Sequence, residues 1–400
     1  MDSFAGALDA LMSEHGASVS AVARQVPCDR ALICRYRNGR QKPSLKMARR
    51  LDDILSADGE LAELAAPGPP TRRAVLAGGL VAGGLLGAGA EALDRILWAQ
   101  QRPAHADAAA AGALADVLAS QRRAEDALGS AALVGPVTTQ MAAVEDLVKE
   151  ARGPARPSVL SVAEQWVQFA AWLHMSTRAF PAAQALWRQV LELAAEASDA
   201  TMTASALTYR AEMAGLAGHP SQMIGLAAAA QRDPCASAVQ LARSAGIEAR
   251  GHAMTGDGQA AERKLDEAAA LAGRGASAPP WLYWCTPQHI AGNRGIALGY
   301  LAGDERYRSQ AIEALTAAYS GSGADMAQSE WGSDFLLYRA AVHARGGDAA
   351  EACADALRVV PVWRQTSSAS LGALLAELRH GLTARFPGHP KVAELAETLR

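Results

Sequence analysis

The segment Ser18–Ser44 constrains the fold of this chain more than any other, because its residue types suit two short helices joined by a tight turn. Ser18 and Asp29 stand where a polar side chain accepts hydrogen bonds from the first backbone N–H groups of each helix. The apolar side chains spaced to meet between the two helices are Val22, Ala23, Ile33 and Tyr36. Asn38 and Gly39 would end the second helix. The pattern predicts a helix-turn-helix.

The charge of this segment differs sharply from that of the whole chain. Residues 18–50 contain nine Lys or Arg and a single acid, Asp29, for a net charge of +8, whereas the 400-residue chain carries −3. A local field of cations on a mildly acidic protein indicates a polyanionic partner. The second helix of a helix-turn-helix enters the major groove, so the sequence predicts double-stranded DNA as a partner.

Position by position, the segment resembles the DNA-binding domain of phage-repressor-like regulators, the XRE family. The matching residues are Ala23, Ile33, Asn38, Gly39, Arg40, Gln41, Lys42, Pro43 and Ser44. Pro27 departs from the family, which usually has glycine at this turn position; the proline ring forbids a positive φ, so the turn must be built differently.

The resemblance also implies roles for individual side chains. Those expected to face base edges are Arg30, Ala31 and Arg35. Those expected to hold phosphates are Asn38, Arg40 and Lys42. The chemistry agrees, because an arginine fork pairs with the two major-groove acceptors of guanine and flexible cations suit phosphate.

Composition predicts an all-α fold in two or three units. Half of the residues are apolar, enough for more than one core in 400 residues. Only 5% are aromatic and alanine dominates long stretches, which favours closely packed helices over sheets. The five cysteines are scattered without a CxxC pair, which is typical of a reducing compartment. No metal site or cofactor is expected, because no cysteine has histidine or acid neighbours at ligand spacing.

A proline-rich break, Pro67–Pro70, separates the N-terminal domain from the rest of the chain. Arg72 and Arg73 then precede 17 uncharged residues, Ala74–Ala90, made of Gly, Ala, Leu and Val. The favoured interpretation is a linker with a small-residue helix. The alternative is a membrane anchor with the N-terminus inside, since twin arginines before an apolar run resemble a translocation signal and the run contains GxxxG steps. The run is shorter than the about 20 residues of a comfortable span.

These observations predict three parts of the chain. The DNA-binding domain is expected at residues 1–66, the linker with its apolar segment at 67–104 and a helical domain at 105–400. The N-terminus has no basic, then apolar, then small-residue signal, so the DNA-reading end is expected in the cytoplasm.

From about Ser161 a unit of helix, turn and helix recurs. The first helix of each unit contains a small residue at Ala171, Ala211, Ala249, Gly295 or Ile296, and Ala340. The turns after these helices begin at Arg178, Gly218, Gly256, Gly303 and Gly347, spaced by 40, 38, 47 and 44 residues. The second helices contain Ala183, Ala261, Ala311 and Ala352. Small residues let helices approach closely, and glycine is expected to end each first helix in a left-handed conformation.

The array resembles tetratricopeptide repeats with longer units, which stack into a superhelix with a concave face. Taken together, the two halves resemble the actinobacterial group of XRE-type regulators with a tetratricopeptide-like C-terminal domain, which implies control of transcription. By analogy, the groove would hold a peptide or small-molecule effector. The candidate groove residues are Trp281, Trp284, Asn293 and Arg294.

Enzyme function is not expected, because the sequence lacks a GxSxG elbow, a phosphate loop ending in Gly-Lys-Ser/Thr and an HExxH helix. The main hypothesis is a cytoplasmic, sequence-specific DNA-binding regulator. A dimer is expected, because one short reading helix contacts too little DNA by itself. The alternative is a tetratricopeptide-like scaffold or membrane-anchored signalling protein that acts through protein partners. Phosphate contacts would make duplex binding depend steeply on salt, which a scaffold would not show.

Overall fold

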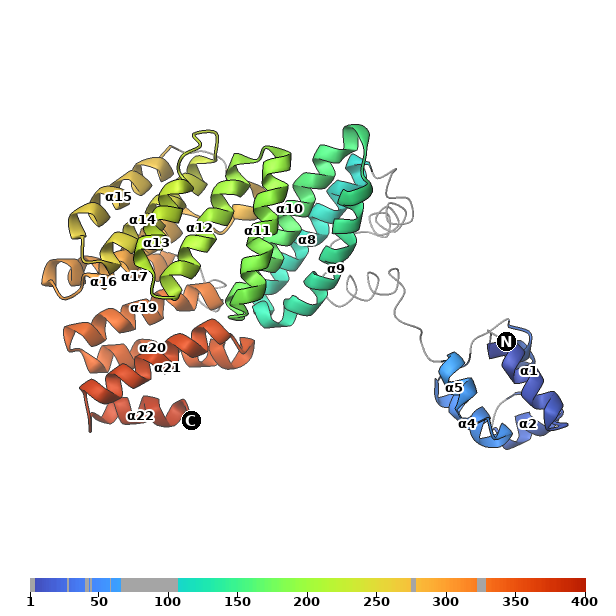
Figure 1. Ribbon diagram of the computed structural model, residues 1–400. Coiled ribbons are helices and arrows are strands. Elements are labelled where there is room, and N and C mark those ends of the chain that lie inside the picture. The colour runs from blue at the N-terminus through green and yellow to red at the C-terminus, as the bar shows by residue number, and fades with distance from the viewer. Residues whose placement is uncertain are drawn as a thin grey trace. The chain divides into compact units, whose positions relative to one another are not determined.

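The computed structural model divides the chain into two compact units, residues 1–75 and 76–400. The residues that the structure describes are 4–26, 29–39, 43, 45–57, 59–65, 107–274, 278–321 and 329–400. Every regular element in these ranges is a helix, so the predicted all-α fold is confirmed (Figure 1).

The first unit is a small bundle. Its helices are α1 (Phe4–Glu14), α2 (Val19–Gln25), α3 (Arg30–Arg37), α4 (Leu45–Leu55) and α5 (Glu60–Ala65). The two predicted caps are confirmed. Ser18 Oγ accepts the backbone N–H of Ala21 at 3.2 Å and begins α2, and Asp29 Oδ1 accepts that of Ala31 at 3.0 Å and begins α3. Both hydrogen bonds satisfy N–H groups that have no partner inside the helix.

The core of the first unit lies between all five of these helices. Val22 and Ile33 are fully buried there, as the sequence predicts. The buried Asp52 of α4 accepts the backbone N–H groups of Leu61 and Ala62 at 2.9 and 2.8 Å, which fixes the start of α5. Gly39 has φ +68° and ends the turn after α3, which confirms the predicted stop. Pro27 lies outside the described residues.

The second unit is a solenoid of stacked helical hairpins. Its helices in chain order are α8 (Ala108–Leu128), α9 (Ser130–Glu150), α10 (Arg156–Ser176), α11 (Phe180–Ala197), α12 (Ala200–Leu216), α13 (Pro220–Ala229), α14 (Ala238–Met254), α15 (Gly258–Ala272), α16 (Pro287–Tyr300), α17 (Glu305–Gly321), α19 (Glu330–Gly346), α20 (Ala349–Thr366), α21 (Ala369–Arg385) and α22 (Pro390–Thr398). Short 3-10 turns are η2 (Gly153–Ala155) and η3 (Pro280–Leu282). Consecutive helices run beside each other across the unit (Figure 1).

Four of the five predicted hairpin turns have the expected left-handed residue. Its φ is +60° at Arg178, +77° at Gly218, +83° at Gly256 and +96° at Gly347. In each case the next backbone N–H donates to the carbonyl five residues earlier at 2.8–3.0 Å, which satisfies a carbonyl at the helix end. The sequence places glycine at three of these positions for this reason.

The prediction for Gly303 is wrong, because this glycine does not have a positive φ. Helix α16 ends earlier, at Tyr300. Two right-handed turns come next, in which Ala302 N–H donates to the carbonyl of Gly299 at 3.3 Å and Asp304 N–H donates to that of Leu301 at 3.0 Å. The longer connection removes the need for a left-handed residue.

Close contact within each hairpin depends on the small residues. The alanines at these positions are fully buried: Ala171, Ala211, Ala249 and Ala340. The facing alanines of the second helices are fully buried as well: Ala183, Ala261, Ala311 and Ala352. In the fourth hairpin the small residue is Gly295, because a Cβ there would lie 2.7 Å from Leu315 Cγ and 3.1 Å from the carbonyl of Ala311. No side chain fits between α16 and α17 at this point.

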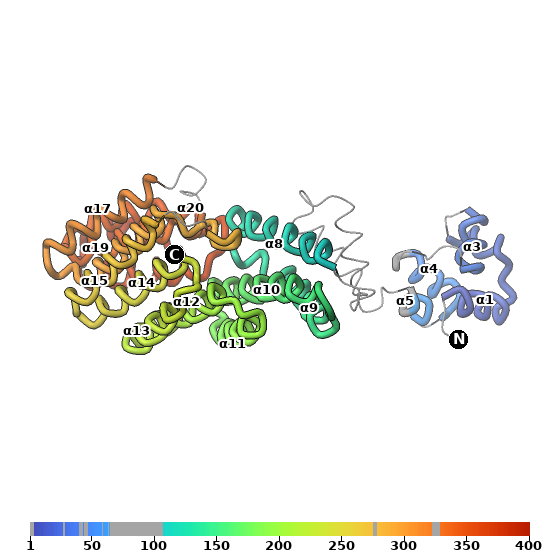
Figure 2. The backbone as a smooth tube through the Cα atoms, turned by 90° about the horizontal axis from the view of Figure 1, so that it is seen from above, coloured from blue at the N-terminus to red at the C-terminus, as the bar shows by residue number. Residues whose placement is uncertain are grey.

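The solenoid curls until its first and last hairpins meet. Ser370 Oγ, at the start of α21, donates to the carbonyl of Ser176 in α10 at 2.9 Å. At the α8–α9 turn, a Cβ on Gly129 would lie 2.7 Å from Thr366 Cβ. Figure 2 shows α8 close to the C-terminal helix α20, and α9 contacts α20. The concave side is therefore partly enclosed.

Among the described residues, no helix is long and apolar enough to cross a bilayer. The apolar run Ala74–Ala90, to which the anchor interpretation refers, lies outside them. The predicted linker, residues 67–104, lies outside them too, so the proposed domain boundaries remain predictions.

Replacing Gly295 by Ala should lower the free energy of unfolding by about 1–3 kcal/mol, because the added methyl group meets backbone atoms of α17. Gly303→Ala is the matched control, since Gly303 has no atom within 4 Å of a built Cβ and no positive φ. Urea unfolding followed by circular dichroism measures both variants. Equal stability of the two variants would contradict the close packing at Gly295.

Candidate functional site

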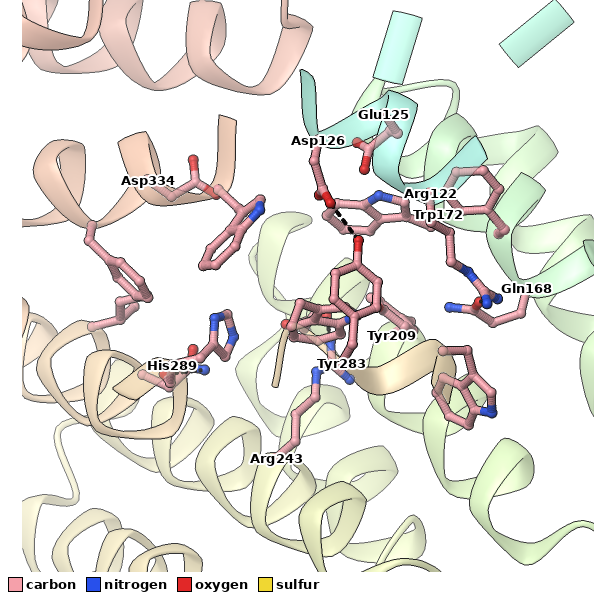
Figure 3. A pocket seen from close by; sticks show the side chains of 18 of the residues that line it. Arg122, Glu125, Asp126, Gln168, Trp172, Tyr209, Arg243, Tyr283, His289 and Asp334 are labelled. Atoms are coloured by element: carbon pink, nitrogen blue, oxygen red, sulfur yellow. Dashed lines mark hydrogen bonds and ion pairs between the residues drawn. The ribbon is translucent and has the colours of Figure 1, made fainter. Parts of the chain in front are cut away.

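The second unit contains a cavity on its enclosed side. Helices α8, α10, α12, α14, α16 and α19 line it, together with the segment after η3, and it holds about 160 Å³ open to water-sized molecules (Figure 3). Nine of the chain's twenty Phe, Trp and Tyr residues line it: Phe169, Trp172, Tyr209, Trp281, Tyr283, Trp284, Trp331, Phe335 and Tyr338. Such a concentration of rings in a chain poor in aromatic residues is typical of a small-molecule site.

A second cavity of about 160 Å³ adjoins the first and reaches α21. The residues that line both are Glu125, Trp172, Glu212, Arg250, Trp331, Asp334 and Tyr338. We call this shared lining the junction. Rings and carboxyl groups dominate it.

Arg243 of α14 is the most deeply buried cation of the first cavity. Its side chain is 3% exposed, and Nη2 donates to Glu212 Oε2 at 2.6 Å. The guanidinium carbon lies 4.1 Å from the ring centroid of Tyr209, a cation–π geometry. The Nη1 atom is buried and has no hydrogen-bond partner among the described residues. A buried donor without an acceptor is costly, so this atom marks a place for a ligand oxygen.

Two further arginines are held by protein groups. Arg250 donates through Nη2 to the hydroxyl oxygens of Tyr300 at 3.1 Å and Tyr338 at 2.7 Å. Arg122 lies over the ring of Phe169, 5.7 Å from its centroid, and burial lowers its pKa to about 10. At neutral pH Arg122 remains charged.

Four carboxyl groups line the two cavities without an ion pair to a described Lys or Arg: Glu125, Asp126, Glu330 and Asp334. Burial, as the largest cause, raises the pKa of Glu125 and of Asp334 to about 7. Burial also raises the pKa of Asp126 and Glu330. Asp126 accepts a hydrogen bond from the Tyr283 hydroxyl at 2.6 Å. In Figure 3 Glu125 and Asp126 project from α8 and Asp334 from α19.

His289 of α16 is surrounded by rings. Its centroid lies 4.9 Å from that of Trp284 and 5.7 Å from that of Phe335. Burial, and next the charge of Arg243, lower the pKa of His289 to about 3, so the imidazole is neutral. Its Nδ1 atom is buried and has no hydrogen-bond partner in the described part of the chain. Among the residues that the structure describes, no group of three or more His, Cys, Asp or Glu is arranged to hold a metal ion.

The first unit presents one continuous polar face on α3. Arg30, Ala31, Arg35 and Asn38 are all exposed. At 3.6 residues per turn they share an arc of about 140° around the helix axis. The buried side chains Ile33 and Tyr36 occupy the opposite side and join the core.

Neighbouring groups hold this face in position. Arg37 lies at its edge, where Nε approaches Asp9 Oδ1 of α1 at 3.3 Å. Asp29 caps the N-terminus of α3. The helix therefore has a capped N-terminus, an ion pair to α1 near its C-terminus and two exposed arginines on its free side. The predicted phosphate-binding residues Arg40 and Lys42 lie outside the described residues.

A comparison with protein-family models matches residues 3–65 to a helix-turn-helix domain. The N-terminal domain is a helix-turn-helix DNA-binding domain. No curated protein matches the chain. The helix-turn-helix domain makes DNA a partner of this protein and indicates a DNA-binding regulator rather than an enzyme.

The candidate groove residues fall in two places. Trp281, Trp284 and Asn293 line the first cavity of the solenoid. Arg294 does not line either cavity; its Nη1 instead pairs with Asp266 of α15 at 3.1 Å on the surface. One residue along a helix turns the side chain by about 100°, which separates Asn293 from Arg294.

Sequence reasoning missed most of the cavity, although the repeat register contains a signal. The residue directly after the small one lines the first cavity in four hairpins: Trp172, Glu212, Arg250 and Ile296. The residue two positions before the small residue also lines the first cavity in four hairpins: Phe169, Tyr209, Asn293 and Tyr338. These positions are three apart and share one helix face. Comparing them across the repeats would have identified the lining.

The buried carboxyls should make stability fall with rising pH. A folded-state pKa of about 7 at Asp334, above its ordinary 3.8, stabilises the fold below pH 4, and this contribution is lost as pH rises through 7. Asp334→Asn should therefore raise the free energy of unfolding at pH 8 by about 1–3 kcal/mol and change it little at pH 4. The exposed Glu192→Gln is the control. Urea unfolding at both pH values measures the effect, and identical pH dependence in wild type and Asp334→Asn would contradict it.

Proposed function

We propose that this protein is a sequence-specific transcription regulator of the XRE type whose helical array senses an effector. The exposed face of α3 on a helix-turn-helix domain is the observation that carries the proposal. The array is proposed to be tetratricopeptide-like, which the buried small residues and four of the five predicted turns support. The predicted domains, 1–66, 67–104 and 105–400, are retained in this proposal.

The proposed base contacts come from three exposed residues of α3. Arg30 and Arg35 would each pair with guanine O6 and N7, and the methyl group of Ala31 would contact a thymine methyl. Asn38, Arg40 and Lys42 would hold phosphates and fix the register of the helix on the duplex. Backbone contacts of this kind strengthen binding to every sequence alike.

A homodimer is proposed because α3, of eight residues, covers too few base pairs to select an operator alone. Two copies related by a twofold axis would read a palindromic site. The proposed compartment is the cytoplasm, where DNA is accessible and the free thiols Cys34, Cys235, Cys285 and Cys353 stay reduced.

Effector sensing is proposed for the central cavity of the solenoid. The unpartnered Nη1 of Arg243 supports this proposal, since an oxygen of a bound molecule would satisfy it. The aromatic rings and the carboxyls without ion pairs support it as well. Trp281, Trp284 and Asn293 would take part in the contact. Helices from both ends of the solenoid line the cavity, so a ligand would bias how the array closes.

Arg35→Ala should weaken binding of the full-length protein to its preferred duplex by about 1–3 kcal/mol and relax selectivity at one base position. The reason is the loss of a bidentate contact to guanine. Fluorescence anisotropy with duplexes varied one base pair at a time measures both effects. Arg188→Ala, an exposed arginine of the array, is the control with the same change in charge.

The same assay gives the salt dependence. The logarithm of the association constant for the duplex should fall linearly with the logarithm of the salt concentration, with a slope of about −0.9 per neutralised phosphate. Duplex binding that is absent at low salt would favour the alternative of a scaffold acting through protein partners. An Arg35→Ala variant with unchanged base selectivity would contradict the assignment of α3 as the reading helix.

A further inference from the structure

The described lining of the two cavities has five carboxyl groups and four arginines, and only one carboxyl forms an ion pair with an arginine. Every arginine that lines either cavity has a protein partner: Arg122 with Phe169, Arg178 with Phe180, Arg243 with Glu212, and Arg250 with Tyr300 and Tyr338. Of the lining carboxyls only Glu212 has an arginine partner among the described residues. Glu125, Asp126, Glu330 and Asp334 therefore have no ion pair with a described arginine, although the charge of Arg250 lowers the pKa of Asp334.

These four carboxyls lie close enough to influence one another. The charges of Asp126 and Glu330 both raise the pKa of Glu125, and the charge of Glu330 raises that of Asp334. Mutual repulsion of these half-buried carboxylates is unfavourable, and Arg250 offsets it in part, since its charge lowers the pKa of Asp334. A positive group placed there would remove the repulsion and restore the ionised form.

Aromatic rings surround the same place. Trp172, Trp331 and Tyr338 line both cavities beside Glu125 and Asp334. Indole and phenol faces attract organic cations, and carboxylates strengthen that attraction. A bare divalent metal ion fits less well, because it requires several oxygen ligands converging on one point, and no such group of three is found among the described residues.

The first cavity also contains a donor that requires an acceptor. Arg243, 3% exposed, has a buried Nη1 without a partner among the described residues, and the neutral His289 beside it has a buried Nδ1 in the same condition. A ligand oxygen near Arg243 would satisfy that donor. The enclosure of the cavity by helices distant in the chain favours a small molecule over a long peptide.

We propose that the junction binds a small organic cation with a flat apolar body. Its protonated amine lies between Glu125 and Asp334 of the junction, with Asp126 of the first cavity and Glu330 of the second nearby. Its body lies against Trp172 and Trp331, and a ligand that also has an acceptor atom would satisfy Arg243 Nη1. This inference names the effector class and rests on the proposed sensing role of the cavity.

Three probes of similar shape and different charge test this inference. Their binding to the full-length protein is measured by calorimetry at pH 7 without DNA. The probes are tryptamine, a cation; tryptophol, which is neutral; and indole-3-propionate, an anion. Tryptamine should bind about tenfold tighter than either. Its binding should also release protons, seen as a heat that depends on the buffer, because the carboxyls ionise around the amine.

The double variant Glu125→Gln/Asp334→Asn should lose the preference for tryptamine, while the exposed Glu192→Gln should keep it. Thermal unfolding checks that the double variant is folded. Equal or tighter binding of tryptophol or indole-3-propionate, or no tryptamine binding at about 1 mM, would overturn the inference. DNA takes no part in this assay, so its failure is separate from a failure of the duplex-binding assay.

Discussion

Close approach of the two helices in each hairpin is the constraint on which the second unit depends. Buried alanines face each other across the hairpins, and at Gly295 even a methyl group would meet the backbone of α17. A small rotation from each hairpin to the next curls the solenoid until Ser370 Oγ reaches the carbonyl of Ser176. The cavity is a consequence of this curvature, because the inner helices turn one shared face toward the same enclosed space.

The cavity concentrates features that burial makes unfavourable in the free protein. Carboxyls without cations, a neutral His289 and the unpartnered Nη1 of Arg243 all lie among aromatic rings. Protein cores normally avoid such groups, whereas ligand sites contain them because a bound molecule satisfies them. The helix-turn-helix domain shows the opposite arrangement, since the side chains proposed to contact DNA are on the exposed face of α3, away from the hydrophobic core.

Local features of the fold were predictable from the sequence, and long-range ones were not. Ser18 and Asp29 as caps, Ile33 in the core and Gly347 in a left-handed turn follow from rules that act within a few residues. The Tyr283–Asp126 hydrogen bond joins positions 157 apart, and nothing in helical periodicity indicates which hairpins meet. For the same reason the sequence indicates Trp281 and Asn293, which lie near each other along the chain, as lining residues. It does not indicate Glu125 and Asp334, which only the curled solenoid brings to the same cavity. Gly303 shows a third limit of sequence-based prediction. Helix α16 ends earlier than expected, and the longer connection to α17 needs no left-handed glycine.

The most direct test of the account is selection of bound fragments from a random DNA library with the purified full-length protein. A helix-turn-helix domain that reads bases through Arg30 and Arg35 predicts enrichment of one recurrent motif containing guanines, arranged as two inverted half-sites for a dimer. Recovered fragments without any common motif, at a salt concentration where the protein still binds duplex DNA, would contradict sequence-specific reading by α3.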